Sequence, residues 1–204
     1  TLSYPHDNKS EYIKKIDQAV ANYAANDVME KSPDLTWVYL QYTDDMGHRF
    51  GESPQMDAGI QEADRQVGLI WNAIQKRMEA YNEDWMIIIT TDHGRKVGGR
   101  GHGGQSDEER ATWIVSNKKF NDVFQQTPGI VSIFPTIAHF MDINIPKNQA
   151  MELDGAGLLG EAYASHLSGE LDGNSLKLSW KSYSSKAKAK IWATSTNQFK
   201  YGET

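Results

Sequence analysis

Carboxylate and imidazole side chains occur in this chain at spacings that suit metal binding. Asp44 and His48 stand four residues apart in YTDDMGH, and Asp92 and His93 are adjacent in IIITTDHG. His102 lies in the glycine-rich run GGRGHGG. Both residue types are common ligands of divalent metal ions. These clusters on successive elements therefore predict side chains that converge on bound metal ions.

The cluster at Asp44 also has a simpler interpretation, because a polar loop with an Asx turn can cap the following element. If this segment is helical, Asp44 and His48 lie one turn apart on the same face, whereas Asp45 points elsewhere. We therefore expect Asp44, rather than Asp45, to be the ligand in this cluster.

The other two clusters have alternatives as well. Asp92 and His93 follow an apolar run, where ionisable groups are costly unless they are paired or bound to a metal. Gly94 permits a sharp exit from that run, although Asp92 could instead cap a helix. The glycines around His102 let the backbone approach a ligand closely, or they mark a mobile surface loop.

Positive charge lies next to these candidate ligands. We predict that Arg95 and Arg100 bind the anionic group of a phosphate or sulfate ester, with simple solvation as the alternative. Solvation is the interpretation favoured for Lys96.

Helices and strands alternate along the part of the chain that carries these residues. Apolar residues at helical spacing predict helices over residues 10–25, 56–81 and 130–141. Short apolar runs predict strands over residues 36–43, 85–91 and 111–116. This order indicates an α/β fold with a mostly parallel sheet flanked by helices. Asp44 and Asp92 directly follow successive strands, so both clusters are expected at the same edge of the sheet.

The last part of the chain has a different pattern. Leu176, Leu178 and Trp180 alternate with polar residues, and residues 187–193 alternate again after a serine-rich turn, which predicts a β-hairpin. We place a boundary near residue 170. Residues 1–170 would form the α/β domain, and residues 171–204 the hairpin, which could begin a β-rich module that the chain truncates.

Composition restricts the class of protein. The 204 residues carry a net charge of −6, which argues against a surface for nucleic-acid polymers. Cysteine is absent, which excludes disulfides, thiolate metal sites and a cysteine nucleophile within the chain. No apolar run is long enough to span a membrane. The chain begins with Thr1 and has no recognisable leader, so we expect a removed leader or a piece of a longer protein.

Several motifs together resemble those of a known family. DxxGHxxG is matched by Asp44, Gly47, His48 and Gly51, TDHG by residues 91–94, and GHGG by residues 101–104. This set resembles the alkaline phosphatase superfamily, nearest to its type I phosphodiesterase/nucleotide pyrophosphatase branch. GIVSIFPTIAHFMDINIP and LDG at 153–155 also resemble the stretch that closes that catalytic domain.

The resemblance implies a hydrolase of phosphodiesters or phosphomonoesters that uses two divalent metal ions, expected to be zinc, with manganese as the alternative. Asp44, His48 and His102 would bind one ion, and Asp92 and His93 the other. The family's nucleophile, a Thr or Ser at a helix start after a metal-binding Asp, has no counterpart upstream of Asp44. The chain thus resembles the C-terminal part of the catalytic domain. Alone it is expected to be inactive, or to associate with the missing N-terminal half through an exposed sheet edge.

Two other functions stay open on this pattern. A sulfatase or a phosphosugar mutase of the same superfamily would use related residues, although the Asp–His pairs suit transition metals better than the calcium of sulfatases. A catalytically silent module could keep the metals for stability. For the favoured function, the substrate is a small phosphate ester. Family members are often secreted, periplasmic or attached to the cell surface.

Overall fold

The computed structural model describes residues 10–191, and the chain divides into two compact units, Thr1–Thr112 and Trp113–Thr204. The boundary predicted near residue 170 lies inside the second unit. All candidate ligands fall in the first unit. None of the described helices is both long and apolar enough to cross a membrane.

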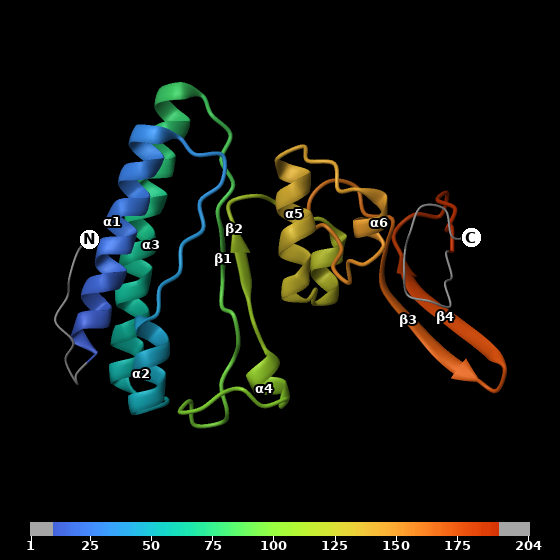
Figure 1. Ribbon diagram of the computed structural model, residues 1–204, viewed down its shortest axis with the longest axis horizontal. Coiled ribbons are helices and arrows are strands. Elements are labelled where there is room, and N and C mark those ends of the chain that lie inside the picture. The colour runs from blue at the N-terminus through green and yellow to red at the C-terminus, as the bar shows by residue number, and fades with distance from the viewer. Residues whose placement is uncertain (1–9, 192–204) are drawn as a thin grey trace. The chain divides into compact units, whose positions relative to one another are not determined.

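The first unit is built on two long helices. Helices α1 (Glu11–Lys31) and α3 (Pro54–Tyr81) lie side by side and run in the same direction (Figure 1). Their apolar stripes meet in a common core, which consists of Ala21, Ala24, Val28, Ile70, Ala73 and Ile74. Ser53 caps α3, and Pro54 occupies its first turn. The helices predicted over 10–25 and 56–81 are confirmed, and α1 continues to Lys31.

The strand predicted over residues 36–43 is not formed. In the described structure residues 33–41 belong to no helix and to no β-ladder, and Tyr42 already begins helix α2 (Tyr42–Phe50). A strand exists only when a neighbouring backbone pairs with it. The segment still has two faces, since Val38 packs against the helical core while Trp37 and Tyr39 are exposed.

The mostly parallel sheet is likewise absent from the described residues, whose sheets are two-stranded. Strand β1 (Ile88–Thr90) is shorter than the predicted run 85–91. Residues 33–41 and 82–91 nevertheless run in the same direction, because each returns from the end of one of the two parallel helices (Figure 1). Their carboxyl ends therefore reach the same end of the unit, as predicted, although no sheet joins them. The coarser expectation of a mixed helix and strand fold is confirmed.

Glu83 joins the C-terminal ends of α1 and α3, which lie at the opposite end of the unit from the candidate ligands. Its carboxylate accepts hydrogen bonds from Nε of the buried Arg77 at 2.9 Å, from Nε1 of Trp85 at 2.8 Å and from Oγ of Ser32 at 3.2 Å. Arg77 also donates to the carbonyl oxygen of Met29 at 3.2 Å. These contacts, above all those of Arg77, lower the pKa of Glu83 from 4.5 to about 2.

The depressed pKa makes the contribution of Glu83 to stability dependent on pH. A carboxyl whose pKa is lower in the folded state stabilises the fold fully above its unfolded pKa of about 4.5. That contribution is lost as the pH falls from about 4.5 through about 2. We expect Glu83→Gln to lower the free energy of unfolding at pH 7, and the difference from the unchanged chain to shrink at pH 3. Urea unfolding measures this, and Glu79→Gln, on the exposed face of α3, is the control expected to change little.

The second unit contains β2 (Ile114–Ser116), short helical turns, helix α5 (Ile133–Phe140), helix α6 (Lys147–Ala150) and a hairpin. The turns are the 3-10 helices η1 (Asp122–Gln126) and η2 (Ile130–Ser132). The predicted helix 130–141 is thus split into η2 and α5. Thr136 stabilises this unit internally, because its buried Oγ1 donates to the Ser132 carbonyl at 2.6 Å and accepts from the Leu158 amide at 2.9 Å.

The hairpin forms with a different pairing from the predicted one. Strand β4 (Ser175–Ser182) contains Leu176 to Trp180 but pairs antiparallel with the preceding β3 (Ala164–Asp172) rather than with residues 187–193. Of the latter, 192 and 193 lie outside the described residues. Gly173, at φ 58°, forms the tight turn between the strands, since glycine adopts this left-handed conformation without strain.

Candidate metal centre

Helix α2 positions the first two candidate ligands. Asp44 and His48 lie one turn apart on it, as the spacing predicts, and Nε2 of His48 is 3.5 Å from Oδ2 of Asp44. The helix begins at Tyr42 because the backbone amide of that residue donates to the buried Asp17 carboxylate of α1 at 2.7 Å. Burial raises the pKa of Asp17, while this hydrogen bond favours its ionised form.

A loop after Thr91 brings the third candidate ligand, His102, to the same place. The loop is closed by Glu109, whose carboxylate accepts from the Gly104 amide at 2.8 Å and whose carbonyl accepts from the Gly94 amide at 2.9 Å. The Gly104 hydrogen bond is the main cause that lowers the pKa of Glu109. Helix α4 (Asp107–Arg110), capped by Ser106, holds Glu109 in place.

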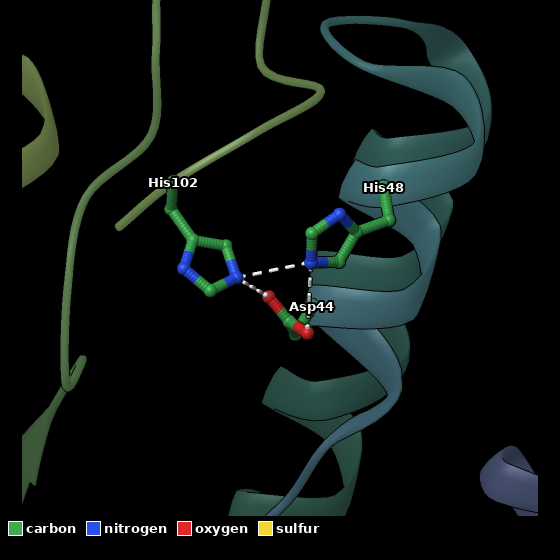
Figure 2. Close-up of side chains that lie close together, drawn as sticks. All are labelled: Asp44, His48 and His102. Carbon is green, nitrogen blue, oxygen red and sulfur yellow. Dashed lines mark hydrogen bonds and ion pairs between the residues drawn. The ribbon is translucent and has the colours of Figure 1, made fainter. Parts of the chain in front are cut away.

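Asp44, His48 and His102 form a compact triangle of ligand atoms (Figure 2). The Nε2 atoms of His48 and His102 are 2.9 Å apart, and Nε2 of His102 is 3.4 Å from Oδ1 of Asp44. Ligands about 2.0–2.1 Å from a tetrahedral zinc ion are separated by about 3.3 Å. The distances in the triangle, including the 3.5 Å between His48 and Asp44, are close to this separation. The donor set therefore fits a divalent ion such as zinc.

Backbone carbonyls hold the rings of two of the candidate histidines. Nδ1 of His48 lies 3.1 Å from the Arg100 carbonyl oxygen, and Nδ1 of His93 lies 2.8 Å from that of Gly94. A carbonyl can only accept, so each neutral ring donates its Nδ1–H there and has a lone pair on Nε2. For His48 that lone pair points into the triangle. Such a partner on the second nitrogen is typical of metal-bound histidine.

The second predicted pair lies directly beside the triangle. Nε2 of His93 is 3.6 Å from Oδ1 of Asp92 and 3.9 Å from Oδ1 of Asp44. The rings of His93 and His102 stack, with centroids 3.7 Å apart. Asp44 therefore faces both groups. Asp92 and His93 supply two donors, which is fewer than the four ligands of a usual zinc site.

The two arginines predicted to bind substrate occupy different positions. The guanidinium of Arg95 forms an ion pair with the Asp44 carboxylate and donates to the Gly99 carbonyl at 3.1 Å, so it is engaged within the protein. Arg100 is exposed, and its backbone carbonyl is the partner of His48. Substrate binding by either residue stays a prediction.

Three carboxylates lie near enough to Tyr39 to act on its hydroxyl electrostatically. The pKa of Tyr39 is raised, first by partial burial of its hydroxyl and then by the charges of Asp92, Asp44 and Asp17. A cation is the natural counterion for such a group of carboxylates.

Sequence reasoning missed two residues that shape this centre, Asp17 and Glu109. Asp17 lies within the buried stripe of α1, between Ile13 and Ala21, and a carboxylate in an apolar stripe was a usable signal. Ser106 and Glu109 match the spacing of a capping box, which was a signal too. The cluster that contains Glu109 looks like an exposed turn in the sequence, but its side chain is buried beneath the Gly104 loop.

In the first unit the candidate metal centre therefore lies where two segments, residues 33–41 and 82–91, end. Helices α1 and α3 lie along one side of these segments (Figure 1). Residues 2–99 match the sequence model of the type I phosphodiesterase / nucleotide pyrophosphatase family. This confirms the predicted resemblance over that part of the chain, which includes four of the candidate ligands, and supports a phosphoester-hydrolase family. The match does not include His102 or the later LDG stretch. No curated protein and no solved structure matches the chain.

Proposed function

We propose that this chain provides the metal-binding part of a phosphodiesterase- or pyrophosphatase-type hydrolase that acts on small phosphate esters. The observation that carries the proposal is the triangle of Asp44, His48 and His102, whose ligand atoms lie within 4.8 Å of one another. The family match over residues 2–99 supports the same reaction class.

Each residue has a distinct task in this proposal. Asp44, His48 and His102 hold one divalent ion, and Asp92 with His93 contributes to a second. Two ions a few ångströms apart polarise a phosphoryl group, lower the pKa of a nucleophile and stabilise the leaving oxygen. In this proposal the exposed Arg100 donates a charge-assisted hydrogen bond to a non-bridging oxygen of the ester. The nucleophile is not assigned to any residue of this chain.

The test uses the full-length protein that contains this sequence. After chelator treatment and reconstitution with Zn²⁺ or Mn²⁺, we expect metal-dependent hydrolysis of bis-p-nitrophenyl phosphate or p-nitrophenyl phosphate. Asp92→Ala should reduce kcat/KM by at least about 100-fold, because metal ions supply several kcal/mol of transition-state stabilisation and each 1.4 kcal/mol is tenfold.

Asp107→Ala is the matched control, because this carboxylate is 92% exposed and pairs only with Arg110 among the described contacts. It should hydrolyse both esters like the unchanged protein. Equal activity of Asp92→Ala and the unchanged protein would refute the proposal. Tight Zn²⁺ binding without any ester hydrolysis would instead favour the silent metal-stabilised module, and the metal that restores activity separates zinc from manganese chemistry.

A further inference from the structure

Arg95 connects three parts of the candidate metal centre. Its guanidinium forms an ion pair with the Asp44 side chain and donates to the Asp44 backbone carbonyl at 2.8 Å. It also donates to the Gly99 carbonyl at 3.1 Å. A single planar group therefore holds a ligand side chain, the backbone of α2 and the glycine-rich loop that leads to His102.

Gly47 provides the space for this arrangement. A Cβ atom at that position would lie 2.4 Å from Cζ and 2.6 Å from Nε of Arg95. The guanidinium thus packs directly against helix α2, on the turn that carries both Asp44 and His48. The Arg95 side chain is only 16% exposed, in keeping with a role inside the protein.

We propose that Arg95 is a positioning residue that assembles the three-ligand triangle before the cation binds. It orients the Asp44 carboxylate toward His48 and His102 and holds the His102 loop against α2. The fork of a guanidinium suits simultaneous donation to a carboxylate and to carbonyl oxygens, which the single ammonium group of lysine cannot reproduce. This inference rests on the cation-binding part of the proposed function.

The positive charge of Arg95 and its positioning contacts are expected to change metal affinity in opposite directions. A positive group beside Asp44 repels a divalent ion, so removal of the charge alone would tighten metal binding. Loss of the positioning contacts would weaken it, by about 10- to 100-fold for partners of this kind. The sign of the change in affinity therefore distinguishes the two roles.

The experiment compares the unchanged chain with Arg95→Gln, Arg95→Lys and Gly47→Ala. Zn²⁺ affinity is measured by competition with a chromophoric chelator, and the visible spectrum of the Co²⁺-loaded chain reports the number and geometry of ligands. Gly47→Ala retains the charge of Arg95 and displaces its guanidinium. Arg110→Gln, which removes a cation from an exposed ion pair, is the control expected to bind Zn²⁺ like the unchanged chain.

We expect about 10- to 100-fold weaker Zn²⁺ binding in the three test variants, together with an altered Co²⁺ spectrum. Equal or tighter binding by folded Arg95→Gln would overturn the proposal. If Arg95→Gln does not fold, equal or tighter binding by Arg95→Lys and Gly47→Ala would overturn it in the same way. If the unchanged chain binds neither Zn²⁺ nor Co²⁺, the metal part of the proposed function fails as well, whereas equal binding by every variant rejects only the role of Arg95.

Discussion

Replacing Asp44 by alanine is expected to weaken Zn²⁺ binding by on the order of 100- to 1,000-fold. A four-ligand zinc site has an apparent binding free energy of about 10–16 kcal/mol, so that each ligand contributes roughly 2.5–4 kcal/mol. Each 1.4 kcal/mol corresponds to about tenfold in affinity. The Asp44 carboxylate lies within 4 Å of Nε2 of His48, His93 and His102 alike, so this variant should have a large effect on the centre. Equilibrium dialysis with zinc analysis measures the change.

Asp45→Ala is the matched control for this prediction. Asp45 is the next residue on α2 and carries the same charge, but it does not belong to the ligand triangle. Its replacement should leave Zn²⁺ affinity nearly unchanged. Equal weakening by both variants would show that net charge, rather than coordination by Asp44, governs cation binding. Asp44→Asn adds a further comparison, since it preserves the shape of the side chain and removes its charge.

Replacing Gly94 by alanine should disrupt the centre without touching a ligand. A Cβ atom there would lie 1.9 Å from the Glu108 carbonyl oxygen and 2.7 Å from that of Ala111, so the backbone itself must move. The change is expected to cost about 1–3 kcal/mol of unfolding free energy, as overpacking does. It should also weaken Zn²⁺ binding, because the Gly94 carbonyl is the partner of Nδ1 of His93. Urea unfolding and chelator competition provide the two measurements.

Gly68→Ala serves as the control glycine. It lies in α3, where a Cβ atom would meet nothing within 4 Å, so alanine should leave Zn²⁺ affinity unchanged. It should also stabilise the chain by up to about 1 kcal/mol through its higher helix propensity. Wild-type stability and Zn²⁺ affinity in Gly94→Ala would contradict the tight approach of this backbone to Glu108 and Ala111.

The helices and the residue types of the candidate ligands could be read from the sequence because both are local properties. Apolar residues at helical spacing defined the stripes of α1 and α3 that meet in the core. The spacing of Asp44 and His48 placed them on one face of a turn, and α2 has that turn. The prediction that Asp44 and Asp92 lie at one end was made from the parallel order of two strands, and the two segments do run in the same direction although no sheet joins them.

Strand formation and the partners of charged side chains could not be predicted in the same way. Residues 36–41 have the composition of a strand, yet a ladder depends on a second backbone at hydrogen-bonding distance. Strand β4 pairs with β3 across the tight turn at Gly173, and the sequence pattern of β4 alone does not specify which neighbouring segment it pairs with. The carboxylates of Asp17 and Glu109 accept hydrogen bonds from backbone amides of other elements or loops. The residues directly beside Asp17 and Glu109 in the sequence do not reveal these partners.

The sequence by itself determined which groups could bind a metal ion, because carboxylate and imidazole chemistry belongs to the residue type. Only the tertiary structure decided how they are arranged. It brought His102 to 2.9 Å from His48 across an intervening helix and loop. It also turned Arg95 toward Asp44, because a charged group leaves water only where an opposite charge and carbonyl oxygens replace its hydration. The groups that replace the hydration of Arg95 are brought to it only by the folding of the chain.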